Sequence, residues 1–113
     1  MKKGKFVLIA SVLIAVFAFS QAFAAPVEIH WWHAMRSARG EVVKKMVEEF
    51  NASQTKYVVI ETNKGNYDET VNAGVAAIRA NKQPHILQSF EVGTQTMMLS
   101  GAIYPVYQLM KDN

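Results

Sequence analysis

The feature that most constrains the fold is a regular alternation of short strand-like runs with longer stretches of helical periodicity. The runs are residues 27–32, 57–60 and 85–90, and the helical stretches are residues 37–53, 67–80 and 92–100, with a further helix starting at 106–111. Strand and helix in strict alternation, joined by short loops, predict parallel strands connected by right-handed crossovers. The sequence therefore predicts an α/β fold with a βαβαβα start.

The two longer helices each carry an apolar stripe. In the first helix, which we expect Ser37 to cap, the predicted core positions are Val42, Val43, Met46, Val47 and Phe50, and the predicted solvent-facing positions are Glu41, Lys44, Lys45, Glu48 and Glu49. In the second helix the stripe is Tyr67, Val71, Val75 and Ile78, with Asp68 and Glu69 in the first turn, where the helix dipole favours acidic side chains. The continuous apolar run at 57–60 predicts a strand covered on both faces.

The first residues have the pattern of a secretory signal peptide. Three lysines lie within residues 1–5, residues 6–19 are almost uninterruptedly apolar, and Ala22-Phe23-Ala24 is a small-x-small cleavage pattern. An uncleaved membrane anchor is the alternative, but the apolar run is short for the roughly 20 residues that span a bilayer. We expect residues 1–24 to be removed, leaving residues 25–113.

Charge and cysteine content narrow the classes of function. The formal charge of +3 equals the contribution of Lys2, Lys3 and Lys5, so the remainder is neutral and gives no indication of a nucleic-acid partner. The chain has no cysteine, which excludes a disulfide framework and a lipid attached to cysteine. We therefore expect a protein released into the periplasm.

A ligand site is expected at one edge of the sheet. Open parallel sheets bind ligands beyond the carboxyl ends of their strands, which here are residues 33–37, 62–67 and 91–93. Glu91 is predicted to follow a buried strand, where a carboxylate is costly unless it is hydrogen-bonded; it is either a structural salt bridge or helix cap, or an acceptor for ligand hydroxyls. Tyr67 begins the second helix and is either core or a ring that presents its hydroxyl outward.

Other motifs give weaker indications. Trp31 and Trp32 could stack on a sugar, but adjacent strand residues face opposite sides, so we favour core or hinge packing. His30 and His33 are also predicted to face opposite sides, and no cysteine completes a metal site. There is no serine elbow, phosphate-binding glycine loop or carboxylate dyad, so the sequence predicts no enzyme, no cofactor and no metal.

Four segments resemble a known family. WHAM, EEFNASQTKYVV, KGNYDETVNAGVAAIRANKQPHILQ and EVGTQTMMLSGAIYPVY are similar to the amino-terminal part of extracellular solute-binding proteins of ABC importers, in particular to the members that bind sn-glycerol-3-phosphate. The resemblance covers nearly all of residues 25–113. It implies a type II periplasmic-binding-protein fold of two α/β lobes closing on a ligand, an ABC permease as partner, and ligand contacts from Tyr67 of KGNY and Glu91 of EVGT.

The resemblance has limits. His85 replaces a usually small or acidic residue, at a predicted strand start far from the cleft, and family members are several times longer. We therefore expect residues 25–113 to form an incomplete first lobe that folds poorly alone. Two alternatives stay open: an importer component for a sugar or oligosaccharide, and a nonfunctional truncated product or small exported interaction domain.

Overall fold

The computed structural model describes residues 25–112, so the predicted signal peptide at 1–24 lies outside the described residues. The elements in chain order are β1 (Val27–His33), α2 (Ser37–Ser53), β2 (Tyr57–Asn63), α3 (Tyr67–Arg79), β3 (Ile86–Leu87), α4 (Glu91–Leu99) and α5 (Val106–Asp112). Within this part of the chain, no helix combines the length and apolar character needed to cross a membrane.

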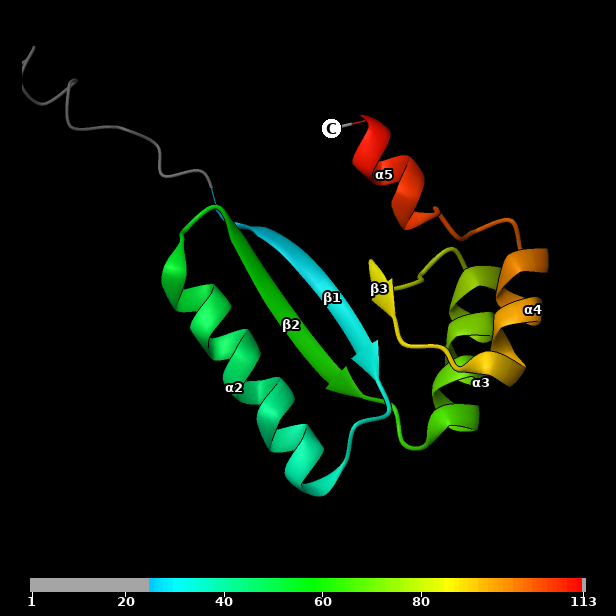
Figure 1. Ribbon diagram of the computed structural model, residues 1–113, viewed down its shortest axis with the longest axis horizontal. Helices are drawn as coiled ribbons and strands as arrows, with labels where there is room; N and C mark the ends of the chain where they lie inside the picture. The colour runs from blue at the N-terminus through cyan, green and yellow to red at the C-terminus, as the bar shows by residue number, and fades with distance from the viewer. Residues whose placement is uncertain (1–24, 113) are drawn as a thin grey trace, which may run out of the picture.

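The three strands form one parallel sheet in the order β2-β1-β3 (Figure 1). β1 pairs with β2 along its whole length, from Val27 opposite Tyr57 to His33 opposite Asn63. β3 pairs with the end of β1 only, where Trp31 and Trp32 face Ile86 and Leu87. The predicted α/β class with parallel strands is confirmed.

Alternation along the strands sends neighbouring side chains to opposite faces. Trp31 lies against His33 with ring centroids 5.5 Å apart, on the face that His33 shares with Glu61. Trp32 lies on the other face, under the ammonium of Lys64, which is 3.9 Å from its ring centroid. The two tryptophans therefore lie on opposite faces and do not form one stacking surface. The alternation rule predicted this separation.

Two amide side chains attach α2 to the outer edge of β2. The Asn51 amide donates to the Val59 carbonyl at 3.0 Å and accepts from the Val59 N–H at 2.8 Å. Gln54 makes the same pair of contacts with Tyr57, both at 2.7 Å. These side chains satisfy backbone groups that an edge strand otherwise leaves open for pairing with another chain.

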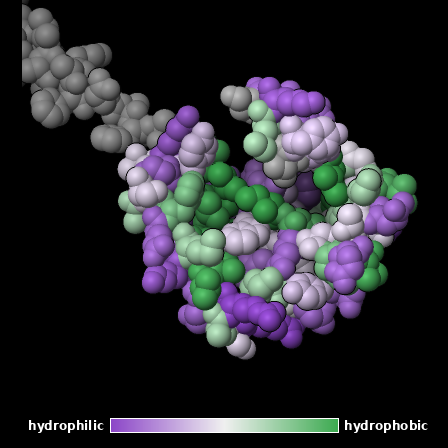
Figure 2. Space-filling model, viewed as in Figure 1, coloured by the Kyte–Doolittle hydropathy of each residue, from purple (hydrophilic) through white to green (hydrophobic). Residues whose placement is uncertain are grey.

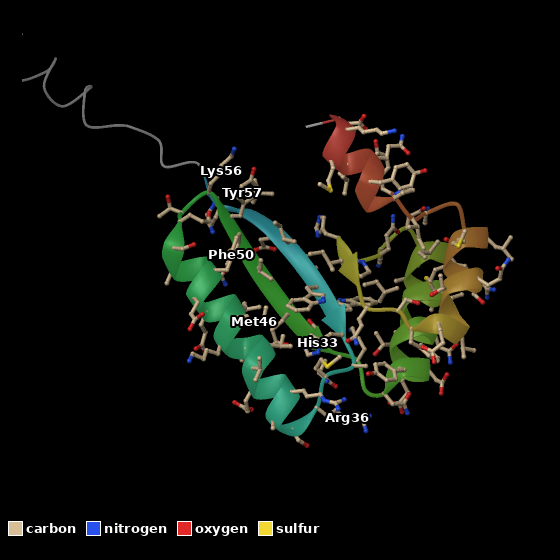
Figure 3. All side chains as sticks on the ribbon, viewed as in Figure 1. His33, Arg36, Met46, Phe50, Lys56 and Tyr57 are labelled. Carbon is tan, nitrogen blue, oxygen red and sulfur yellow. The ribbon has the colours of Figure 1, made fainter. Side chains whose placement is uncertain are left out.

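The predicted core stripe of α2 is mostly wrong. Of its five positions only Val43 is buried, whereas Val42, Met46 and Phe50 are 59%, 56% and 42% exposed. Met46 and Phe50 lie on the side of α2 that faces β2 (Figure 3), but a single strand is too narrow to cover that side. Figure 2 shows the resulting apolar surface over the strands at the centre of the molecule. The predicted solvent-facing positions are exposed, as expected.

Small residues bring α3 close to β3 and α4. The buried residues of α3 are Thr70, Val71, Gly74 and Ala77, so Val71 alone of the predicted stripe is fully covered. A Cβ at Gly74 would lie 2.4 Å from Leu87 Cδ2, and one at Gly93 of α4 would lie 2.8 Å from Val71 Cγ2. Met97 of α4 is also buried, with 2% of its surface exposed.

Three element predictions need correction. The third strand covers Ile86–Leu87 and not 85–90, because Leu87 already pairs with the penultimate residue of β1 and little of β1 remains beyond it. β2 extends to Asn63 and is half-buried, since no described strand lies on its outer side. Ser37 does not cap α2: Arg36 holds the extended N-cap position without a side-chain cap, and Ser37 has a φ of 49°.

Candidate ligand-binding edge

The loops that follow the three strands meet at one edge of the sheet, as the strand-end rule predicted. The Lys64 N–H donates to the His33 carbonyl at 2.9 Å, and the Asn63 amide donates to the Met35 carbonyl, so the loops after β1 and β2 are joined. The Ala34 N–H donates to Gln88 Oε1 at 2.9 Å, which ties in the segment after β3. The same edge carries the N-termini of α2, α3 and α4 (Figure 1).

Tyr67 is held at this edge by the start of α3. Asn66 and Glu69 form a capping box: Asn66 Oδ1 accepts from the Glu69 N–H at 2.9 Å, and Glu69 Oε2 accepts from the Asn66 N–H at 2.7 Å. The Tyr67 ring stacks on Phe90, with centroids 5.4 Å apart and planes inclined by 23°. Tyr67 is 41% exposed, and its hydroxyl has no hydrogen-bond partner among residues 25–112, so it is available to a ligand.

Glu91 lies in a different setting from the one predicted. It is the first residue of α4, not the residue that ends a strand, because β3 ends at Leu87. Phe90 is the N-cap residue and no side chain caps the helix. The Glu91 carboxylate is exposed, and across the described residues it makes neither a hydrogen bond nor an ion pair. A carboxylate in this first turn is stabilised by the helix dipole.

Phe90 connects the two predicted site residues. Its ring packs on Tyr67 and its backbone leads directly into Glu91. The Phe90 carbonyl accepts from the N–H groups of Gly93 and Thr94, each at 3.0 Å, which fixes the first turn of α4. The structure therefore brings the neighbourhoods of Tyr67 and Glu91 together through one aromatic contact that the sequence did not indicate.

An open hollow of about 360 Å³ lies beside Tyr67, and Glu91 is not part of its wall. It is lined by Ala34, Met35, Arg36, Ser37, Ala38, Arg39, Asn66 and Tyr67. A second hollow of about 570 Å³ adjoins it on the α2 side and is lined by residues that include His33, Glu61 and Lys44. Neither tryptophan lines either hollow.

Arg36 and Lys64, the two cations in the loops directly after β1 and β2, already have partners. The Arg36 guanidinium is 3.0 Å from Glu69 Oε2, and both side chains are more than half exposed, so this ion pair contributes at most about 1 kcal/mol. Lys64 lies over the Trp32 ring. Because this ion pair is weak and Arg36 lines the hollow beside Tyr67, the guanidinium can turn to an anionic ligand at small cost.

The histidines that suggested a metal have separate partners. His30 stacks on His85 with ring centroids 5.8 Å apart, whereas His33 contacts Glu61 at 2.7 Å. Among residues 25–112 no three histidine or acidic side chains are grouped as metal ligands. His85 precedes β3 and is not its first residue, and its Nδ1 accepts from the His30 N–H at 3.0 Å.

Comparison with curated proteins finds relatives that share one name. The chain is 46% identical over 113 residues to the sn-glycerol-3-phosphate-binding periplasmic protein of Agrobacterium fabrum, which is 99% of this chain and 26% of that protein. The proteins of the same name from Yersinia pestis and Rhizobium meliloti are 47% and 43% identical, over 90% and 84% of this chain and 24% and 22% of their own lengths. No protein-family model matches the chain.

The chain thus spans about a quarter of the length of the curated relatives it matches. The resemblance that the sequence motifs indicated is confirmed. The chain is a homologue of part of the sn-glycerol-3-phosphate-binding periplasmic proteins.

Proposed function

We propose that the protein to which this chain contributes captures sn-glycerol-3-phosphate, or a glycerophosphodiester, in the periplasm as the substrate-binding component of an ABC importer. It would deliver the ligand to a permease in the inner membrane and would perform no covalent chemistry. The names of the relatives support the ligand class. The observation that carries the proposal is the pair of polar groups, the Tyr67 hydroxyl and the Glu91 carboxylate, that have no partner within residues 25–112 and lie at the edge where α2, α3 and α4 begin.

The two groups suit different parts of a glycerol phosphate. An ionised Glu91 carboxylate only accepts hydrogen bonds, and it would repel a phosphate dianion, so its role is to accept from the glycerol hydroxyls. The Tyr67 hydroxyl is a neutral donor suited to a phosphate oxygen, and a hydrogen bond to a charged acceptor is stronger than a neutral one. Arg36, in the wall of the hollow beside Tyr67, adds a cation on the phosphate side.

The same geometry weighs against a sugar ligand. Sugar recognition through the tryptophan pair needs at least one indole face at the site, but Trp31 packs on His33 and Trp32 is covered by Lys64. A guanidinium beside a phenol favours an anionic ligand over a neutral saccharide. The oligosaccharide alternative therefore has less support than the phosphate ester.

The test is a calorimetric titration of sn-glycerol-3-phosphate into two proteins. The first is the chain itself, and the second is a chimera in which residues 25–113 replace the matching segment of the Agrobacterium fabrum relative. Glycerol and maltose are the control ligands. Saturable heat in the chimera with the phosphate ester alone is expected.

The chimera also decides between the alternatives. If the folded chimera binds maltose, or fails to bind sn-glycerol-3-phosphate while the unaltered relative binds it, the proposal is wrong. Binding by the chain alone would show that this edge holds the ligand without further residues. A chain that binds only within the chimera needs contacts from the rest of the cleft.

A further inference from the structure

A buried histidine and a carboxylate lie directly behind the candidate edge. His33, the last residue of β1 (Figure 3), is 1% exposed. Its Nε2 is 2.7 Å from Glu61 Oε2 in β2. These two residues are 28 positions apart in the chain and meet because Trp31 and Glu61 are register partners in the sheet. Neither residue has a part in the ligand contacts proposed above.

The hydrogen bonds of His33 specify one tautomer. Its Nδ1 lies 3.1 Å from the Met35 N–H, which can only donate, so Nδ1 must be the unprotonated acceptor. The ring proton is then on Nε2, where it donates to the Glu61 carboxylate. Glu61 therefore selects the tautomer in which His33 can hold the backbone of the following loop.

That loop is connected to the start of α3. The Met35 carbonyl accepts from the Asn63 amide, and Asn63 Oδ1 in turn accepts from the Gly65 N–H at 2.9 Å. Gly65 is followed by Asn66, which is the N-cap of α3 and the residue immediately before Tyr67. A continuous series of contacts thus runs from His33 to the residue that precedes Tyr67.

We propose that His33 and Glu61 are positioning residues for the ligand edge: Glu61 fixes the Nε2–H tautomer of His33, His33 holds the loop at Met35, and the loop holds the N-terminus of α3 through Asn63 and Gly65. The link to a ligand rests on the function proposed above, whereas the link to the α3 N-terminus does not. The pair acts through other residues and touches no ligand itself.

Two substitutions separate the two hydrogen bonds of His33. In His33→Asn, the side-chain oxygen takes the place of Nδ1 and accepts from the N–H two residues on, as in an Asx turn, but the contact with Glu61 is lost. In His33→Gln, the longer amide reaches Glu61 and leaves the Met35 N–H without its acceptor. His30→Asn, on the same strand but with a half-exposed ring away from Glu61, is the matched control.

The first measurements need no ligand. Nitrogen NMR of the chain should show His33 with an unprotonated Nδ1 and a protonated Nε2. Amide hydrogen exchange at Met35 and at Asn66 should accelerate roughly fivefold in His33→Gln, the factor expected for loss of one ordinary hydrogen bond. In His33→Asn and His30→Asn it should stay within about twofold of the unaltered chain.

The opposite results would overturn the proposal. It is wrong if His33 is protonated at Nδ1, if the Gln and Asn variants behave alike, or if exchange at Met35 accelerates while Asn66 is unaffected. Titration of sn-glycerol-3-phosphate into the chimera carrying each variant then tests the link to the ligand, with about fivefold weaker binding expected for His33→Gln only. Absence of binding by the unaltered chimera would refute the proposed function and leave the exchange result to decide the positioning role.

Discussion

Gly93→Ala tests whether the close approach of α3 and α4 positions the ligand edge. Gly93 is the third residue of α4, two positions after Glu91, and is buried. A methyl group there would lie 2.8 Å from Val71 Cγ2, 3.1 Å from Ser89 Oγ and 3.2 Å from Val71 Cγ1. Val71 is itself 7% exposed and branched at Cβ, so it has little freedom to rotate away.

Two opposing free-energy contributions set the change in stability caused by Gly93→Ala. Replacing glycine by alanine inside a helix stabilises the helix by about 1 kcal/mol. Inserting a methyl group into a packed contact costs about 1–3 kcal/mol when neighbours must shift. Since three atoms would lie within 3.2 Å, we place this site in the middle of that range and expect a net loss of about 1 kcal/mol. That loss corresponds to roughly fivefold faster opening of α4.

Val71→Ala reverses the sign of that effect. The smaller side chain removes both Val71 contacts, and its own cost is about 2 kcal/mol for the lost burial and the space left behind. In this background the only close contact left to the methyl group of Gly93→Ala is Ser89 Oγ at 3.1 Å, on an exposed side chain that can rotate away, so the helix-propensity gain of about 1 kcal/mol should appear as a stabilisation.

The assay is amide hydrogen exchange of α3 and α4, because it reports local opening. It compares the unaltered chain, Gly93→Ala, Val71→Ala and the double variant. Thr96→Ala, at an exposed position of α4, is the control for a change in helix propensity alone. If Gly93→Ala slows exchange with Val71 in place, or shows no sign reversal with Val71→Ala, the contact does not constrain the two helices and the reasoning fails.

Three further predictions concern single interactions. Thr70→Val should raise the free energy of unfolding by about 1 kcal/mol in denaturant titration, because the buried Thr70 hydroxyl has no partner within the described chain; a loss of stability would show that the hydroxyl is satisfied. Asn51→Ala should accelerate exchange at the Val59 amide roughly fivefold and promote self-association measured by sedimentation, and an unchanged Val59 amide would contradict the edge contact. The hydrogen bond to Asp112 raises the pKa of Tyr104, so Asp112→Asn should lower that pKa in an NMR titration; an unchanged pKa would refute the contact. The stability that this contact contributes should be lost as the pH rises through the Tyr104 pKa.

The order of the elements could be predicted because the sequence patterns that indicate helices and strands involve residues close together in the chain. Helical periodicity at 37–53 and 67–80 gave both helices, which the structure places at Ser37–Ser53 and Tyr67–Arg79. Gly101, directly after the C-cap residue of α4, has a φ of 67°, in the left-handed region where glycine commonly ends a helix. The rule that parallel strands present their carboxyl ends at one edge then located the meeting point of the loops without any knowledge of contacts.

Burial could not be predicted because it depends on what lies opposite each face. The stripe of α2 has the spacing of a core face, yet Met46 and Phe50 stay half open because β2 is the edge of a three-stranded sheet. In α3 the reverse holds: Thr70 and Gly74 are buried although neither is a typical core residue, since Leu87 and α4 approach closely there.

Much of the candidate edge depends on contacts between distant residues. The stacking of Tyr67 on Phe90 and the pair His33–Glu61 join residues 23 and 28 positions apart, and no local pattern encodes them. The capping box of Asn66 and Glu69 could have been predicted, because Asn followed by Glu three residues later at a helix start is a sequence signature. The setting of Glu91 was predicted wrongly because β3 ends at Leu87, three residues before the predicted strand end.

The most direct test of the account measures whether Tyr67 and Glu91 bind the same ligand. Titration of sn-glycerol-3-phosphate into the chimera should give at least about tenfold weaker binding for Tyr67→Phe, which removes a donor to the charged phosphate, and for Glu91→Gln, which replaces a charged acceptor by a neutral one. The control Gln95→Ala, exposed on α4, should bind normally. If both site variants bind within twofold of the unaltered chimera, the edge described here is not the ligand site.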